Sequence, residues 1–380
     1  MKVLHVITGL GIGGAEQQLR LMLRQLPTHN EVVTLTDPGP VAEGIVADGV
    51  RVAHLDMAGN RDLAALPRLT RLVKRGGYDL VHTHLYRACL YGRIAARMAG
   101  VRTILATEHS LGAVQIEGRP LTPGARALYL TGERLGTATV AVSTTVARRL
   151  ERWGVRRDRI HVVPNGIESG RFAFDEKARR AAREGLGLAE DAFVVGGVGR
   201  LAPGKRYDRL VRAVGELSGA RLLLVGEGPE RARLLRLAQE RRMADRVLLP
   251  GACEDPPPVP HPGDLPSLLA AMDVFVSTSH DEAFGLAVVE ALAAGLPVLH
   301  VTCPALQDLP PEAAPGARRV SGSVPGLAEE LRRLRALGPH RRPVPPAVHH
   351  YDIARSAEQL MAVYEGALRR QPPTREASSS

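Results

Sequence analysis

Two carboxylates eight residues apart mark the part of this sequence best equipped for chemistry. Residues 280–290 read HDEAFGLAVVE, so Glu282 and Glu290 flank a Phe-Gly-Leu turn. The run that follows favours helix, which puts Glu290 in the first turns of a helix and Glu282 in the loop before it. A helix start offers unpaired backbone N–H groups that suit a phosphate, and carboxylates accept hydrogen bonds from hydroxyls. The segment therefore indicates a site for a nucleotide sugar.

A basic turn follows the first strand predicted for the second half of the chain. Residues 199–206 read GRLAPGKR, and Lys205 is one of only four lysines. Arg200 and Lys205 flank a Pro-Gly turn that can aim both cations at one point. Two cations stabilise the charge that grows on a departing diphosphate, a task otherwise given to a divalent metal. The alternative is an ordinary basic surface turn, and the Walker A spacing is absent.

A glycine-rich loop opens the first predicted helix. Residues 9–14 read GLGIGG, and Asp37 ends the next predicted strand. This combination matches the dinucleotide fingerprint G-x-G-x-x-G with its acidic partner. The same glycines also suit close approach of another molecule to the backbone. This loop alone is compatible with an NAD-dependent oxidoreductase and with a sugar-binding site.

Three histidines follow or lie within predicted strands of the first half. His109 comes directly after a strand, so it either touches a substrate or bonds within its own loop. His82 and His84 alternate on one strand and point the same way. With no third ligand pattern beside them, we expect them to line or underlie the ligand region and to bind no metal. No nucleophile with a paired base, such as G-x-S-x-G, occurs.

Strand, loop and helix alternate along the chain twice over. Predicted strands cover 2–8, 31–36, 50–55, 79–83, 103–107, 139–143 and 160–163, then 193–199, 221–225, 247–249, 274–277 and 298–301. Predicted helices cover 15–26, 63–75, 89–99, 126–135 and 144–153, then 206–217, 230–241, 265–272, the run after 285, 327–337 and 352–370. The pattern predicts an α/β protein with two doubly wound Rossmann-like domains facing across a cleft. Ligands of such sheets bind beyond the carboxyl ends of the strands, where each motif above lies.

Composition narrows the class of protein further. The chain has 380 residues, 44% hydrophobic and 3% aromatic, which suits two Leu/Val/Ala-rich cores and offers few stacking platforms for nucleic acid. Three widely spaced cysteines form neither a disulfide framework nor a zinc pattern. No signal peptide or membrane span is evident, so we expect a cytoplasmic protein.

The net charge of +10 is uneven along the chain. Residues 1–168 hold 22 basic against 14 acidic side chains, and the remainder is nearly balanced. A basic first half suits peripheral contact with an anionic membrane at its inner face, or a phosphorylated acceptor. It suits an Arg-rich solvated surface equally well.

From Met1 to about Leu368 the chain resembles the retaining glycosyltransferases of family 4, which have the GT-B fold. The strongest shared motif is E-x7-E, from Glu282 to Glu290. The other shared segments are 13–16 (GGAE), 79–84 (DLVHTH), 142–143 (VS), 163–167 (VPNGI), 199–205 (GRLAPGK) and 225–229 (VGEGP).

The resemblance implies a role for each candidate residue. Glu290 is expected to hold the ribose hydroxyls, and Glu282 those of the donor sugar. Arg200 and Lys205 are expected to neutralise the diphosphate. His109 is expected to face the donor sugar. The remaining donor-binding candidates are Gly13, Gly14, Gly226, Ala283, Phe284, Gly285 and Leu286.

The resemblance also implies a reaction and a domain plan. A UDP- or GDP-linked sugar passes to a hydroxyl acceptor with retention and without a metal or other cofactor, in cell-envelope polysaccharide, glycolipid or specialised-metabolite synthesis. We expect an acceptor-side domain over 1–168 and a nucleotide-sugar domain over 169–350. A helix over 351–370 is expected to pack back on the first domain, before a disordered tail over 371–380. The rivals are an NAD-dependent oxidoreductase, a non-catalytic nucleotide-sugar binder and a sugar-nucleotide epimerase.

Three features depart from the family pattern. Ala283 stands where the family usually has Gly, and residues 300–306 read HVTCPAL in place of the common Gly-Gly turn. Residues 253–263 (CEDPPPVPHPG) form a Pro-rich insertion expected to be a stiff, extended surface loop. The segment 111–123 is expected to form an acceptor-side loop.

Overall fold

The computed structural model describes residues 1–59, 62–112, 115–116, 119–253 and 263–369. Two expectations therefore concern residues outside the described ranges: the conformation of the Pro-rich insertion at 254–262, and the tail 371–380. None of the described helices has both the length and the apolar character that a membrane span needs.

Contacts within the chain divide it into two compact units. The first comprises Met1–Gly11, Gln18–Pro164 and the described residues from Ala354 on. The second comprises Ile12–Gln17 and Asn165–Ile353. The chain thus leaves the first unit after Pro164, whereas the sequence analysis puts the boundary after residue 168. The C-terminal helix belongs with the first unit.

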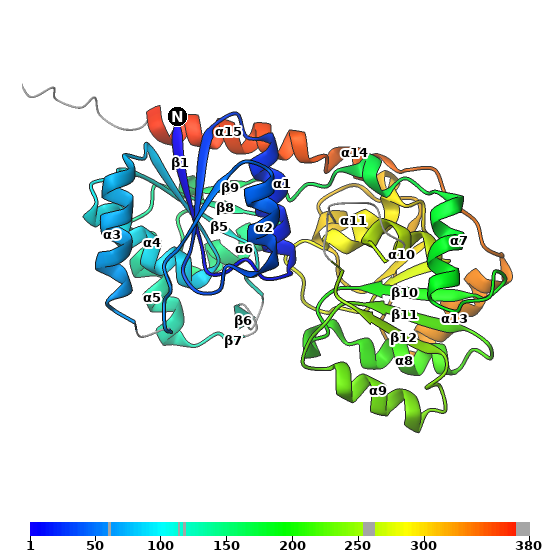
Figure 1. Ribbon diagram of the computed structural model, residues 1–380. Helices are drawn as coiled ribbons and strands as arrows, with labels where there is room; N and C mark the ends of the chain where they lie inside the picture. The colour runs from blue at the N-terminus through cyan, green and yellow to red at the C-terminus, as the bar shows by residue number, and fades with distance from the viewer. Residues whose placement is uncertain (60–61, 113–114, 117–118, 254–262, 370–380) are drawn as a thin grey trace, which may run out of the picture. The chain divides into compact units, whose positions relative to one another are not determined.

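The first unit contains a seven-stranded parallel sheet in the order β3-β2-β1-β4-β5-β8-β9, flanked by helices (Figure 1). Its strands are β1 (Lys2–Ile7), β2 (His29–Thr34), β3 (Arg51–His54), β4 (Leu80–His84), β5 (Thr103–Glu108), β8 (Ala138–Ala141) and β9 (Ile160–Val162). A two-stranded hairpin, β6 (Gln115–Ile116) and β7 (Arg119–Pro120), lies within the predicted acceptor-side loop. The associated helices are α1 (Gly14–Gln25), α2 (Gly39–Ala47), α3 (Ala65–Gly76), α4 (Tyr86–Met98), α5 (Pro123–Glu133), α6 (Thr144–Trp153) and α15 (Ile353–Arg369).

Both faces of this sheet are buried, because the pleat sends alternate side chains to opposite sides. Leu4 and Val6 of β1 join a core with residues of α3 and α4, whereas Ile7 joins residues of α1 and α2. His5 shares the parity of Ile7, so it projects from the face opposite Leu4 and Val6.

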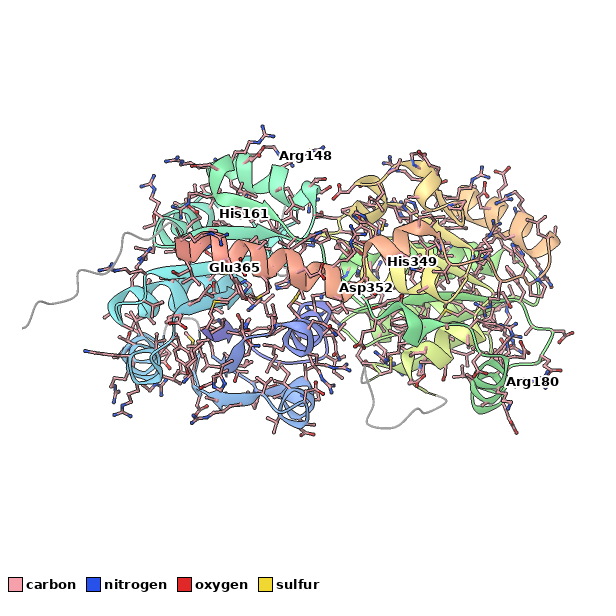
Figure 2. All side chains as sticks on the ribbon, turned by 90° about the horizontal axis from the view of Figure 1, so that it is seen from above. Arg148, His161, Arg180, His349, Asp352 and Glu365 are labelled. Carbon is pink, nitrogen blue, oxygen red and sulfur yellow. The ribbon has the colours of Figure 1, made fainter. Side chains whose placement is uncertain are left out.

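Helix α15 packs on the first sheet, in part through a polar contact. The hydroxyl of Tyr364, a fully buried residue, lies 2.7 Å from Nδ1 of His82 on β4. Further along, α15 lies against His161 of β9 and carries Glu365 on its exposed side (Figure 2). The last helix is therefore part of the first unit's packing.

The second unit contains a six-stranded parallel sheet in the order β12-β11-β10-β13-β14-β15 (Figure 1). Its strands are β10 (Val194–Val198), β11 (Arg221–Val225), β12 (Val247–Gly251), β13 (Val274–Ser277), β14 (Val298–His300) and β15 (Ala317–Arg319). Its helices are α7 (Glu176–Gly185), α8 (Tyr207–Gly215), α9 (Arg231–Glu240), α10 (Leu265–Ala271), α11 (Leu286–Ala293), α12 (Pro304–Gln307), α13 (Val324–Ala336) and α14 (Pro346–His350). The prediction of two doubly wound, Rossmann-like sheets is confirmed.

Helix α7 was missed by the sequence analysis because it packs through charge. Its sequence, EKARRAAREG, carries no large apolar side chain. Arg179 and Arg183 reach instead to the buried carboxylate of Asp273, at 2.6 and 2.9 Å. Asp273 also accepts a 2.8 Å hydrogen bond from the backbone N–H of Val194, at the start of β10. This network fixes α7 to the edge where β10 and β13 begin.

We expect Asp273→Ala to destabilise the second unit by about 3–5 kcal/mol, because it leaves two largely buried guanidinium groups without their anion. Urea unfolding followed by circular dichroism measures the change. The matched control is Asp158→Ala, which removes the exposed Arg156–Asp158 pair and should have no measurable effect. An Asp273 variant as stable as the control would show that the network is not what holds α7.

Candidate functional site

The second sheet reverses its strand order between β10 and β13. Strands β11 and β12 follow on one side of β10, and β14 and β15 follow β13 on the other. Such a reversal leaves a crevice beyond the carboxyl ends of the two strands, where open α/β sheets bind ligands. The loop that carries Arg200 and Lys205 follows β10, and the loop that carries Glu282 follows β13. The sheet topology therefore brings the two charged motifs together.

Lys205 and Glu282 are in direct contact at this edge. Lys205 Nζ donates to Glu282 Oε1 at 2.5 Å, and the two side chains are 30% and 15% exposed. A charge-assisted hydrogen bond that is partly shielded from water is stronger than a surface pair. The contact joins two of the predicted catalytic residues.

Two hydroxyl groups at the end of β13 fix the turn that carries Lys205. Thr278 Oγ1 donates to the carbonyl of Lys205 at 2.6 Å, and Ser279 Oγ lies 3.3 Å from the carbonyl oxygen of Gly204 and 3.2 Å from that of Asp281. Both residues are 1% exposed. Their role could not be predicted, because two small polar residues after a strand carry no signal of their own.

Arg200 is the exposed member of the basic pair. In the part of the chain that the structure describes, its guanidinium has no hydrogen-bond or ion-pair partner. A long cation with no protein partner remains available to an anionic ligand.

The turn between the two carboxylates depends on Gly285. Gly285 has φ of 106° and caps the start of α11 in the left-handed region. A Cβ there would also come 2.7 Å from Cys303 Sγ, so the position is restricted to glycine on two counts. Phe284, by contrast, is buried, while Ala283 and Leu286 are partly exposed beside it.

The departure from the family pattern at 300–306 has a structural counterpart at this turn. The backbone N–H of Ala305 donates to the carbonyl of Phe284 at 3.0 Å. The Sγ atom of Cys303 lies 3.6 Å from the same carbonyl oxygen. The Cys-Pro-Ala segment thus supports the loop before α11.

Glu290 lies on α11, one turn after its start, and is partly buried. Burial raises the pKa of its carboxyl to about 7, and the positive charge of Arg171 offsets part of that rise. Arg171 belongs to a short 3-10 turn, Ser169–Phe172, that packs against α11. Near pH 7 the Glu290 carboxyl is thus poised between its neutral and charged forms.

Gly226 allows two loops of the second unit to meet backbone to backbone. It has φ of 147°, and a Cβ there would lie 2.1 Å from the carbonyl oxygen of Gly199. The loop after β11 therefore packs directly on the loop that leads to Arg200. This close approach is the reason for glycine at position 226.

The glycine-rich loop after β1 contributes Gly13 and Gly14. Ile12–Gln17 groups with the second unit, and a Cβ at Gly14 would lie 3.5 Å from Leu286 Cδ1, an ordinary contact. A Cβ at Gly13 would clash with the Glu16 carboxylate, which can move aside. Gly14 thus lies beside the first residue of α11.

Asp37 lies three residues beyond the end of β2 and is exposed. Strand β2 ends at Thr34, and Asp37 Oδ1 accepts a 2.9 Å hydrogen bond from the backbone N–H of Gly39 at the start of α2. The carboxylate therefore supports this loop, while the basic turn and the paired carboxylates of the second unit have no role in the oxidoreductase alternative.

His109 lies in the first unit, directly after β5. Its Nε2 lies 3.1 Å from Nδ1 of His84, and its own Nδ1 is buried with no hydrogen-bond partner among the described residues. Burial lowers the pKa of His109 to about 4, so the ring is neutral at physiological pH.

The sequence shows no third ligand pattern beside His82 and His84, but the structure brings His5 to them. His5 pairs in register with His82 on the neighbouring strand, and the three rings lie close enough together to share a metal ion. Both ring nitrogens of His82 are nevertheless engaged, with Tyr364 and Thr107, each at 2.7 Å. Each ring of the cluster thus has a hydrogen-bond partner among the described residues.

Two Rossmann-like units, one carrying a basic turn and paired carboxylates at its strand-order reversal, define the class of GT-B glycosyltransferases. The chain matches Glycosyltransferase Family 4 over residues 12–171 and Glycosyl transferases group 1 over residues 178–342. It is 34% identical to a D-inositol 3-phosphate glycosyltransferase of Acidothermus cellulolyticus, over 80% of this chain and 71% of that protein. The chain therefore belongs to the family 4 glycosyltransferases.

Other comparisons agree with this assignment. A 2-deoxystreptamine glucosyltransferase of Streptomyces kanamyceticus is 29% identical, over 71% of this chain and 72% of that protein. The crystal structure of Anabaena HepE in complex with UDP and glucose superposes with a TM-score of 0.82 at 20% identity. It covers 96% of this chain and all of the HepE chain, which establishes a common fold.

We expect Glu290→Gln to stabilise the protein at high pH only. A carboxyl whose pKa is about 7 when folded and 4.5 when unfolded opposes folding increasingly as pH rises through that window. The gain at pH 8 should be at most about 3 kcal/mol, and it should vanish near pH 4. Urea unfolding at both pH values, with the exposed Glu184→Gln as control, measures it; a pH-independent difference would contradict the shift.

We expect Thr278→Val to lower glycosyltransferase turnover about tenfold, because it releases the Lys205 carbonyl and lets the cation shift. Thr278→Ser keeps the hydroxyl and should retain most of the turnover. Initial rates and urea unfolding, measured on both variants, separate positioning from stability. Equal turnover in the Val and Ser variants would show that the Thr278 hydroxyl does not position Lys205.

Proposed function

We propose that the protein transfers a sugar from a nucleoside diphosphate sugar to a hydroxyl acceptor with retention of anomeric configuration. The observation that carries this proposal is the Lys205–Glu282 pair at the strand-order reversal of the second unit, with Glu290 on the adjoining helix. The cation suits the anionic diphosphate of such a donor, and the carboxylates suit its neutral hydroxyls.

Lys205 and Arg200 are the groups that would receive the diphosphate. Lys205 already holds one anion, Glu282, so a bound diphosphate would share or displace that partner. Exposed Arg200 would add a second positive charge. The negative charge on the leaving phosphate grows as the glycosidic bond breaks. Both cations would therefore stabilise the transition state more than the bound donor, which lowers the barrier.

Glu282 and Glu290 are the groups that would orient the donor. Glu282 would accept from hydroxyls of the sugar, and Glu290 from those of the ribose. The backbone of Ala283–Leu286 would lie at the sugar and phosphates, where the N-terminus of α11 favours negative charge. Gly13, Gly14 and Gly226 would leave room beside these loops, and His109 would approach the sugar.

Retention follows a front-face course in this proposal. The acceptor oxygen bonds to the anomeric carbon on the face that the phosphate leaves, and the carbon–oxygen bond to phosphate breaks. The acceptor's proton passes to the departing phosphate oxygen. The two cations supply the charge stabilisation for this step, and we propose that no metal is required.

The relatives suggest which acceptors to try first. Their names give D-inositol 3-phosphate and 2-deoxystreptamine, both polyhydroxylated six-membered rings. Cell-envelope polysaccharide, glycolipid and specialised-metabolite synthesis all use hydroxyl acceptors. We propose an acceptor of this chemistry, tested by adding each compound to the donor and measuring product by mass spectrometry.

We also propose a cytoplasmic location with contact at the inner face of the membrane. The excess of basic side chains over residues 1–168 supports it. Co-sedimentation with phosphatidylserine vesicles at low and high salt tests the contact; absence of low-salt binding rules it out.

The donor experiment compares two variants with a control. A panel of UDP- and GDP-sugars is screened by thermal shift and by slow hydrolysis, with NAD as the negative control. Lys205→Ala should lower turnover about 100-fold with little change in nucleotide affinity, and Glu290→Ala should weaken nucleotide binding about tenfold. Exposed Lys177→Ala should match the wild type.

Each alternative gives its own result in this experiment. Stabilisation by NAD and not by any nucleotide sugar would identify an oxidoreductase. Binding without hydrolysis or transfer would identify a non-catalytic binder. Full activity in both site variants would refute the site.

A further inference from the structure

Three of the four clustered imidazoles in the first unit form a hydrogen-bonded chain that begins at Asn30 and ends at His109. His5 Nε2 lies 3.3 Å from Asn30 Oδ1, and His5 Nδ1 lies 3.1 Å from His84 Nε2. His84 Nδ1 lies 3.1 Å from His109 Nε2. His82 packs beside His84 but bonds elsewhere, to Tyr364 and Thr107. The chain proper is therefore Asn30–His5–His84–His109.

Asn30 sets the direction of every hydrogen bond in this chain. Its Nδ2 donates to the carbonyl of Thr28 at 3.1 Å, and its Oδ1 accepts from Thr28 Oγ1 at 2.7 Å. If the amide were flipped, its oxygen would face the carbonyl oxygen of Thr28, so the amide orientation is fixed. Oδ1 can only accept, and the proton between Asn30 and His5 must therefore belong to His5 Nε2.

The remaining protons follow from neutrality. Burial lowers the pKa of His5 and His109 to about 4 and the pKa of His84 well below its usual value. Each neutral ring has one N–H and one lone pair. His5 Nδ1 must accept from His84 Nε2–H, and His84 Nδ1 must accept from His109 Nε2–H. His109 Nδ1 is left with a lone pair.

We propose that Asn30, His5 and His84 are positioning residues that hold His109 as its Nε2–H tautomer, so that its Nδ1 accepts a hydrogen bond from a substrate hydroxyl. Two observations support a ligand as the partner. His109 Nδ1 is buried without a hydrogen-bond donor among the described residues, which is an unfavourable state for a polar atom. His109 as a whole is only partly buried.

The chain also lies where the fold would put a site. Strands β1 and β4 are the pair at which the first sheet reverses its strand order, and β5 follows β4. His5 and His84 come from the reversing pair, and His109 follows β5. The inference rests on the proposed function, because it takes the hydroxyl to belong to the donor sugar.

The first test reads the tautomers directly in the wild-type protein. Long-range proton–nitrogen NMR on histidine-labelled protein, assigned with single His→Gln variants, should show His5, His84 and His109 neutral and protonated on Nε2 at pH 7.5. An Nδ1–H or a charged His109 would overturn the chain. Stoichiometric zinc in the purified protein, lost in His5→Phe, would overturn it in favour of a metal site.

The second test asks whether the chain affects the sugar. UDP-glucose is compared with its monodeoxyfluoro analogues, in which fluorine cannot donate a hydrogen bond. One analogue should be turned over about tenfold less well by the wild type. In His5→Phe, which frees His84 to adopt either tautomer, that discrimination should fall below about threefold.

His82→Phe is the matched control, since His82 is equally buried on the adjacent strand but lies outside the chain. It should keep the full discrimination, whatever it does to stability. Wild-type discrimination in His5→Phe would overturn the positioning role. If no nucleotide sugar is turned over at all, the proposed function fails, whereas a wrong tautomer in an active enzyme refutes the chain alone.

Discussion

The reversal of strand order beside the first strand of each sheet is the constraint on which the rest of this structure depends. Parallel strands end at one edge, and a reversal sends the flanking connections apart, which leaves that edge open between two loops. In the second unit those loops carry Lys205 and Glu282, which meet at 2.5 Å. In the first unit the reversing strands carry His5 and His84. Every residue with a proposed chemical role is thus on, or supported by, an element whose position follows from sheet topology.

Small uncharged residues then determine how firmly the loops that carry the charged side chains are positioned. Gly285 can adopt the turn before α11 only because it has no side chain, and Cys303 fills the space against it. Thr278 and Ser279 anchor the Lys205 turn through its carbonyls, so the lysine's backbone is fixed although its side chain remains partly exposed. Such an arrangement keeps the entropy cost of ordering low, because only the side-chain torsions of Lys205 have to be ordered when an anion binds.

The sequence predicted the fold class, most strands and the charged motifs, because these have periodic or charged signals. Strands β11 and β13 and helix α6 have the predicted limits, since apolar runs and clear caps bound them. Helices α2 and α7 were missed: α2 contains Gly and Pro, and α7 packs through Arg179 and Arg183 on Asp273. His5 was missed as a neighbour of His82 because strand register, which pairs the two, is not visible in a single sequence. Thr278 was missed because its partner is a backbone carbonyl 73 residues away.

The two units differ in the kind of electrostatics they offer, and the proposed reaction gives a reason. A departing diphosphate gains negative charge, which formal cations such as Lys205 and Arg200 stabilise. The sugar carbon gains positive charge at the same time, and an imidazolium beside it would oppose that change. A neutral ring whose proton is held away from the substrate offers a lone pair and no positive charge. Burial of His5, His84 and His109, which lowers the pKa of each, secures that neutral state. Burial does not select between the two neutral tautomers of each ring. The fixed amide of Asn30 makes that selection.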